Sequence, residues 1–129
     1  MPNIILSYTK NLEELNFNTI FFKIHHILSS ISNIDDCKSR AVLLENVYIG
    51  SGDENTAITE LQIILLPGRT LPVKQKIAQQ LYSEIFLTEI MPLVEKRKLN
   101  CKPTCEIKEV DVYYKVLGDN FTQLSPRAS

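Results

Sequence analysis

The chain has 129 residues, of which 44% are hydrophobic, and this suits one domain with a packed core. Its 14 basic and 15 acidic residues give a net charge of −1, so it lacks the basic face expected for a nucleic-acid partner. No apolar run reaches membrane-spanning length and no secretory signal is recognisable, so we expect a cytoplasmic protein without a membrane partner.

The first half of the chain predicts a strand, a helix and a second strand. Residues 3–8 form a short apolar strand, and Pro2 precedes it at one of the few places where a sheet accepts proline. From Phe17 to Ile31, apolar residues recur every three or four positions, which is typical of an amphipathic helix. Residues 40–48 are rich in β-branched and apolar residues, which predicts the second strand.

The second half repeats this order. Residues 57–66 give the strongest strand signal, and apolar residues on both faces indicate a central strand. Pro67 and Gly68 break the strand, and Thr70 is the predicted N-cap of a second helix.

Apolar residues from Val73 to Ile90 form the buried stripe of this second helix. Pro92 should kink or end the helix near Met91. Residues 105–113 predict the last strand, with an irregularity at Lys108–Glu109.

Each half of the chain therefore reads as a βαβ crossover that contributes two parallel strands. The predicted fold class is α/β, or α+β, with a four-stranded mixed sheet and two helices on one face. The other face should be apolar and needs a partner, which other copies of the chain would supply as a symmetric homo-oligomer. We predict one domain over residues 1–121 and a loose tail over 122–129.

The cysteines and histidines do not form a recognisable metal or redox motif. Cys37, Cys101 and Cys105 are odd in number and lack ligand spacing, so we interpret them as reduced thiols. His25 and His26 are adjacent and point about 100° apart on a helix, which does not suit one shared metal ion. We expect no metal and no cofactor.

Pro2 is the first candidate catalytic residue. Removal of Met1 would turn it into a free secondary amine, which has a lone pair and a direction fixed by its ring. At the head of a strand, such a base would be held by the scaffold itself. The alternative is that Pro2 is inert, because many chains begin with Met-Pro.

Three cations are candidate binding residues. Lys38 and Arg40 lie two residues apart, so on a strand they project from the same face. Arg69 follows the turn at Pro67. Each of the three is equally explained as a solvated strand end or loop residue. Four tyrosines are possible proton donors, although we interpret them as half-buried packing residues: Tyr8, Tyr48, Tyr113 and Tyr114.

Taken together, these features resemble the tautomerase superfamily, and within it the 5-carboxymethyl-2-hydroxymuconate isomerase family. The resemblance covers nearly the whole chain. It rests on Met1-Pro2 at the start, Lys38-Ser39-Arg40 opening the second strand, Pro67-Gly68-Arg69-Thr70 after the third, and Glu106-Ile107-Lys108-Glu109-Val110 in the last. The family pattern at these places is roughly Met-Pro, Arg-Ser-Arg, Gly-Arg-Ser and Glu-Ile-Glu-Glu-Leu.

The resemblance implies a homotrimer with active sites near the subunit contacts and an N-terminal proline as general base. It implies a proton shift along a small unsaturated acid of the 2-hydroxymuconate type, in the catabolism of aromatic compounds. Pro2 would be the base, and Lys38, Arg40 and Arg69 would bind the substrate carboxylates.

The chain departs from the family pattern in two ways. Lys38 stands where the family has arginine, and lysine keeps the charge but loses the bidentate fork that suits a carboxylate. Aliphatic residues replace the family's aromatic residues after this position, at Val42, Leu43 and Val47. Another keto–enol tautomerase activity, and a non-catalytic trimeric module that retains Met1, are therefore the alternative hypotheses.

Overall fold

The computed structural model describes residues 2–110, 114–117 and 120–123. Its elements in chain order are β1 (Asn3–Thr9), the 3₁₀ turn η1 (Lys10–Leu12), α1 (Phe17–Ser32), β2 (Lys38–Leu44), β3 (Thr56–Leu65), α2 (Leu71–Leu81), the π-helical η2 (Tyr82–Ile90), α3 (Met91–Arg97), β4 (Asn100–Glu109), β5 (Tyr114–Leu117) and β6 (Asn120–Gln123). Within this part of the chain, no helix is both long enough and apolar enough to cross a membrane.

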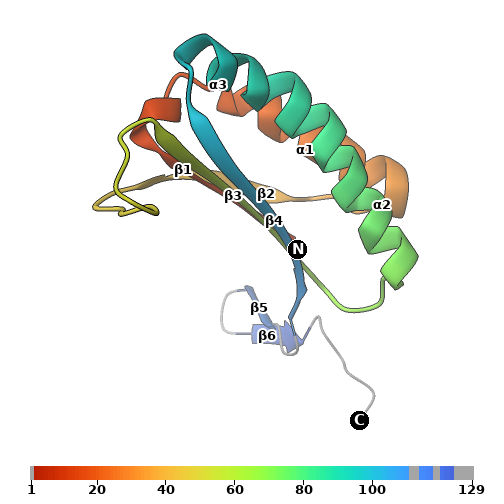
Figure 1. The fold of residues 1–129 in the computed structure, drawn as a ribbon. Coiled ribbons are helices and arrows are strands. Elements are labelled where there is room, and N and C mark those ends of the chain that lie inside the picture. The colour runs from red at the N-terminus through yellow and green to blue at the C-terminus, as the bar shows by residue number, and fades with distance from the viewer. Residues whose placement is uncertain (1, 111–113, 118–119, 124–129) are drawn as a thin grey trace.

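The four long strands form one mixed sheet in the order β2-β1-β3-β4. β1 pairs parallel with β2, β3 pairs parallel with β4, and β1 pairs antiparallel with β3. Both long helices cover the same face of this sheet (Figure 1). The predicted pair of βαβ halves is therefore confirmed.

β5 and β6 form a separate antiparallel hairpin, which the sequence did not predict. The predicted domain boundary at residue 121 falls inside β6. Residues 124–129, most of the predicted tail, lie outside the described residues, so the tail stays a prediction.

The core lies between the sheet and the two helices because alternate strand residues point to the helical face. Ile4 and Leu6 of β1 are almost fully buried, and Ile63 beside them on β3 is completely buried. Ile20 and Ile24 of α1 are also completely buried. β3 lies between β1 and β4, so the predicted central place of residues 57–66 is confirmed.

The opposite, open face of the sheet is less apolar than predicted. Ile5 and Ile64 are half-buried there, but Glu60 is exposed, and Gln62 donates a hydrogen bond to Glu106 across β3 and β4 at 3.1 Å. The face predicted to be apolar is therefore mixed, with polar residues among the apolar ones. Polar residues at alternate positions can keep such a face in contact with water or with polar groups of a partner.

Two strands begin earlier than the sequence indicated because strand pairing sets their limits. β2 runs from Lys38 to Leu44, and its last residue pairs with Thr9, where β1 ends. Beyond it, Asn46 has φ +55°, which is incompatible with an extended strand. β4 begins at Asn100 and pairs with β3 without interruption through Glu109, so the irregularity predicted at residues 108–109 is absent. Residues 111–113, the end of the predicted strand, are not described.

The first helix begins where a polar side chain can satisfy its free N–H groups. The Asn16 side chain accepts a hydrogen bond from the Thr19 N–H at 3.1 Å, and the helix ends at Asn33 in the left-handed conformation. Thr70 occupies the predicted N-cap of the second helix, although its hydroxyl makes no capping hydrogen bond.

Pro92 does not end the second helix, which continues to Arg97. Residues 82–90 are π-helical, with hydrogen bonds that span five residues rather than four. The helix returns to the α-form at Met91. Near this residue, where a kink or an end was predicted, the helix therefore changes type and does not end. The wider turn before Pro92 gives its ring room that a regular α-helix would deny.

Candidate active site

Pro2 lies at the head of β1 and is buried. Its carbonyl oxygen accepts a hydrogen bond from the Lys38 N–H at 3.0 Å, which ties it to the first residue of β2. The strand therefore holds Pro2 in a fixed position at one end of the sheet, as expected.

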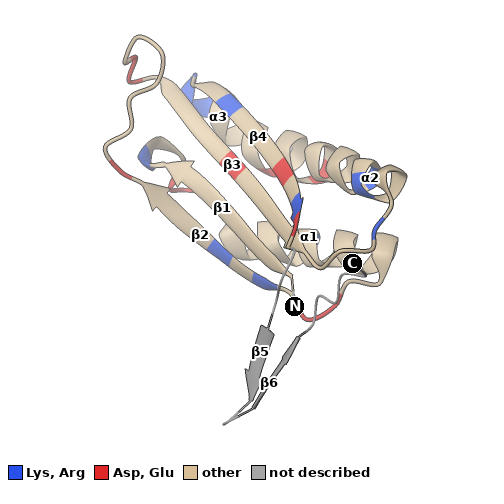
Figure 2. Ribbon diagram, turned by 90° about the horizontal axis from the view of Figure 1, so that it is seen from below, with Lys and Arg blue, Asp and Glu red and all other residues tan. Residues whose placement is uncertain are grey.

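Lys38 and Arg40 lie on the open face of the sheet. Lys38 is paired with Asn3 and Arg40 with Ile5, and both cationic side chains are exposed. Figure 2 shows the two basic positions of β2 beside the N-terminal end of β1. The predicted shared face is confirmed, and the register places Lys38 nearer to Pro2 than Arg40.

Arg69 approaches the same end of the sheet from the other side. Its Nε donates a hydrogen bond to Ser32 Oγ at 3.2 Å, and its Nη1 donates one to the Leu66 carbonyl at 3.3 Å. Ser32 ends α1, and the following segment leads into Lys38. Because β1 lies between β2 and β3, Lys38 and Arg69 flank the Pro2 end of β1 from two directions.

The Arg69 guanidinium is not neutralised by a carboxylate within the described ranges. Its two hydrogen bonds go to a hydroxyl and a carbonyl, which leave its positive charge uncompensated. A half-buried arginine of this kind is suited to a carboxylate ligand.

Glu109 contacts the turn that carries Arg69, and no role was predicted for it from the sequence. Its carboxylate accepts hydrogen bonds from the Gly68 N–H at 2.9 Å and from Lys74 Nζ at 2.8 Å. Glu109 belongs to the last of the motifs that carry the family resemblance, and this was the signal that could have marked it. Ser32 gave no such signal, because nothing in a serine near a helix end indicates its partner.

The histidines and tyrosines lie apart from this arrangement or pack beside it. His25 Nε2 and Ser39 Oγ are 2.5 Å apart, so His25 links α1 to β2. This contact agrees with a position at the edge of the apolar face of α1. Tyr8 packs on Phe17 with ring centroids 4.7 Å apart, which confirms its packing role. Tyr48 is 81% exposed, so half-burial was wrong for it. The side chains of Tyr113 and Tyr114 are not described.

The thiols are poor nucleophiles at neutral pH. Burial raises the pKa of the Cys37 thiol above its ordinary value, and the nearby Asp35 raises it further. Burial also raises the pKa values of the Cys101 and Cys105 thiols. Over the residues that the structure describes, His, Cys, Asp and Glu side chains do not gather in groups of three or more that could hold a metal ion.

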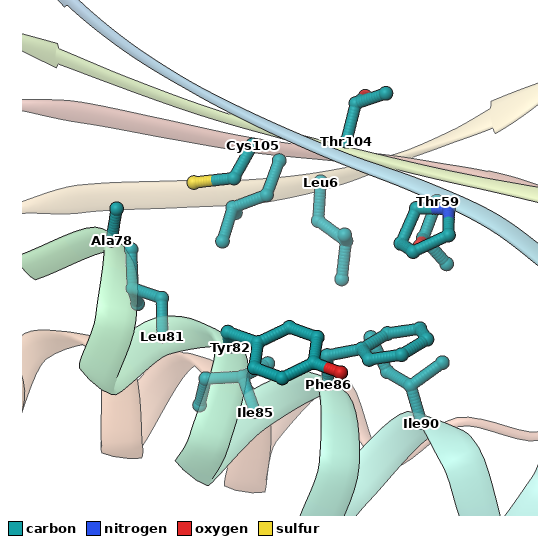
Figure 3. Close-up of a pocket in the computed structure, with 12 residues that line it drawn as sticks. Leu6, Thr59, Ala78, Leu81, Tyr82, Ile85, Phe86, Ile90, Thr104 and Cys105 are labelled. Carbon is teal, nitrogen blue, oxygen red and sulfur yellow. The ribbon is translucent and has the colours of Figure 1, made fainter.

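An apolar cavity of about 200 Å³ lies elsewhere, between α2–η2 and the strands β3 and β4. Leu6, Ile85, Phe86 and Cys105 are among its lining residues, and none of the described residues that line it is charged (Figure 3). A carboxylate would lose its hydration there without a compensating charge. This cavity therefore does not suit a carboxylate ligand.

The comparisons with known proteins agree with the fold. The family model described as 5-carboxymethyl-2-hydroxymuconate isomerase matches residues 2–123. A 5-carboxymethyl-2-hydroxymuconate isomerase from Deinococcus radiodurans R1 aligns with a TM-score of 0.73 at 22% identity, covering 84% of this chain and 82% of that one. No match was found among curated protein sequences.

Two further solved structures extend the likeness. A 5-carboxymethyl-2-hydroxymuconate delta-isomerase aligns with a TM-score of 0.72 at 17% identity, covering 92% of this chain and 89% of that one. A fused 4-OT described as a symmetric trimer aligns with a TM-score of 0.58 at 9% identity, covering 84% of this chain and 86% of that one. The match of the family model over nearly the whole chain shows that this protein belongs to the 5-carboxymethyl-2-hydroxymuconate isomerase family.

Proposed function

We propose that the protein is an isomerase that moves a proton along a 2-hydroxymuconate-type unsaturated acid, with Pro2 as the general base. The favoured reaction converts 5-carboxymethyl-2-hydroxymuconate into its 2-oxo isomer during the catabolism of aromatic compounds. The observation that carries the proposal is the burial of Pro2 at the end of the sheet that Lys38 and Arg69 flank. Membership of the isomerase family supports the reaction class.

In the proposed mechanism, Met1 is removed and the Pro2 nitrogen becomes a free secondary amine. The amine takes the proton from the dienol hydroxyl, the electron pair moves through the conjugated chain, and a carbon further along receives the proton. Pro2 thereby returns to its starting state. The proton balance closes without an oxidant or a reductant, so the proposed step is independent of a cofactor.

The cations would serve this step in two ways. Lys38, Arg40 and Arg69 would hold the substrate carboxylates and stabilise the dienolate charge as it develops. Burial and nearby positive charges both lower the pKa of an amine, so they favour the unprotonated base. A base whose pKa is close to the working pH is the most effective.

We further propose a homotrimer in which each site is completed by a neighbouring copy, in the cytoplasm. The exposed Lys38 and Arg40 side chains, the half-buried apolar residues of the open face and the two edge strands β2 and β4 leave surface for such a neighbour. The structural likeness to a symmetric trimer is in line with this assembly.

The test compares the wild type with Pro2→Ala, both expressed from the native start codon. Intact mass should show the loss of Met1 in both, and the variant should lose about 99% or more of the isomerase turnover. Sedimentation equilibrium should give three times the 14.7 kDa chain mass for both proteins, which shows that the loss is not a failure to assemble. Retained Met1, or equal turnover in Pro2→Ala, would contradict the assignment of the base.

A second candidate is another keto–enol tautomerase activity with Pro2 in the same role. It is favoured by Lys38 in place of the family's arginine and by Val42 and Leu43, which are exposed where the family has aromatic residues. Assays with 5-carboxymethyl-2-hydroxymuconate and with phenylpyruvate separate the two activities. A mass that includes Met1, together with no turnover of either compound, would instead support a non-catalytic module.

A further inference from the structure

We propose that Lys74 and Glu109 are positioning residues for Arg69 in the active site. This inference rests on the proposed function. Glu109, with its partners Gly68 and Lys74, forms an arrangement that we call the carboxylate clamp. The clamp holds the turn that carries Arg69, and Lys74 keeps the Glu109 carboxylate from competing with the substrate for Arg69.

The first step is the geometry of the turn between β3 and α2. Gly68 has φ +127°, a conformation that L-residues rarely adopt, and a Cβ there would meet no atom within 4 Å. The glycine is therefore required by its backbone conformation rather than by lack of space. Gly68 itself is exposed, so its position in the turn depends on a contact from another element.

Glu109 supplies this contact from the end of β4. Its Oε2 accepts the Gly68 N–H at 2.9 Å, and its Oε1 accepts Lys74 Nζ at 2.8 Å. One carboxylate thus binds the turn and the beginning of α2 at the same time. The Lys74 and Glu109 side chains are only 25% and 20% exposed, so water screens this pair less than a surface ion pair.

The second step concerns charge. Gly68 and Arg69 are neighbours in the chain, so the Glu109 carboxylate bound to Gly68 lies close to the turn position of Arg69. Within the described part of the chain, Arg69 forms no ion pair with it, and Lys74 takes the carboxylate instead. Arg69 is the cation of this turn, and in the proposed competition Glu109 pairs with it once Lys74 is removed. A neutralised Arg69 would bind a substrate carboxylate less tightly.

The proposed competition predicts a change in KM without a change in kcat, which a merely structural contact would not predict. Lys74→Met should raise KM for the dicarboxylate substrate about tenfold and leave kcat within about twofold, because binding is lost rather than chemistry. Glu109→Gln keeps an oxygen for the Gly68 N–H but removes the charge, so KM should rise by about twofold at most. The double variant Lys74→Met/Glu109→Gln should recover the KM of Glu109→Gln.

The matched controls are Lys76→Met, an exposed lysine on the same helix, and Glu95→Gln, an exposed glutamate on α3. Both should keep the wild-type KM. A double variant with a KM as high as Lys74→Met, or a Lys74→Met that behaves like Lys76→Met, would overturn the competition between Glu109 and Arg69.

A readout without turnover separates this inference from the proposed function. The Gly68 amide should exchange with solvent at least about tenfold faster in Glu109→Ala than in the wild type, because its acceptor is gone. Binding of adipate, an unreactive dicarboxylate, should weaken in Lys74→Met and recover in the double variant. If the wild type turned over no substrate while both results held, the proposed function would fail and the clamp would stand. If the wild type were active but the Gly68 amide exchanged at the same rate in Glu109→Ala as in the wild type, the clamp would be overturned and the proposed function would stand.

Discussion

Pro2 shows at the scale of single residues how a common amino acid acquires a special environment. Its burial and its hydrogen bond to the Lys38 N–H come from its place at the head of β1. Arg69 acquires its direction in the same way, from Ser32 and the Leu66 carbonyl. The chemistry of these residues is ordinary, and their neighbours make them candidates for a site.

Lys38 provides the residue-scale prediction. Lys38→Arg restores the bidentate fork of the family pattern, so KM for a dicarboxylate substrate should fall about fivefold with kcat little changed. Steady-state kinetics on the variant measures this. Lys10→Arg, an exposed lysine in η1 beyond the opposite end of β1, is the control and should match the wild type. An unchanged KM in Lys38→Arg would remove Lys38 from the carboxylate contacts.

At the scale of elements, local polar contacts decide where the helices begin and how far they run. The second helix crosses Pro92 by becoming π-helical over residues 82–90, where Thr88 Oγ1 also donates a hydrogen bond to the Ser83 carbonyl at 3.0 Å. The ion pair between Lys23 and Glu89, with 2.5 Å between Nζ and Oε1, joins α1 to this segment. Packing and side-chain contacts thus keep helical a segment that proline would disfavour on its own.

Asn16 gives the element-scale prediction. Its side chain accepts the Thr19 N–H at the start of α1, so Asn16→Ala should lower the free energy of unfolding by about 1 kcal/mol. Urea denaturation at neutral pH measures the change. Asn18→Ala, at an exposed position two residues later, removes an asparagine without removing the cap and should not lower stability. Equal losses in both variants would show that the cap is not the cause.

At the scale of the whole molecule, the antiparallel pairing of β1 with β3 joins the two halves and brings the candidate site residues of both halves to one end of the sheet. The N-terminal ends of β1 and β2 meet the C-terminal ends of β3 and β4 at one end of the sheet. Pro2 and Lys38 come from the first pair of strands, and Arg69 and Glu109 follow or end the second. The site is therefore a product of topology, since its parts are up to 107 positions apart in the chain.

The three thiols give a prediction for the stability of the whole fold. Burial raises their pKa values, so the folded state keeps protons that the unfolded state loses near the ordinary value of 9.0. Stability should consequently fall as the pH rises from about 9 through the folded pKa values. Urea unfolding at pH 7, 8, 9 and 10 measures this.

A variant with all three cysteines replaced by serine is the control for that titration. Tyrosine and lysine also titrate at alkaline pH, and the variant retains them. Its stability should fall less steeply above pH 9 than that of the wild type. Identical slopes would show that the thiols do not contribute.

The sequence by itself determined the order of the four long strands and the two long helices, the central place of β3 and the candidates Pro2, Lys38, Arg40 and Arg69. Period-two and period-3.6 patterns are local, and the family motifs are contiguous, so both can be seen without a structure. The limits of β2 and β4 could not be read in this way, because a strand lasts as long as its partner in the sheet.

Only the tertiary structure decided which residues lie together at the candidate site. Glu109 contacts Gly68 and Lys74 across 41 and 35 positions, and Ser32 contacts Arg69 across 37. No pattern in the sequence encodes such pairs, since they depend on strand order and register. The polarity of the open face also depends on the register, because the register decides which residues of each strand point to that face.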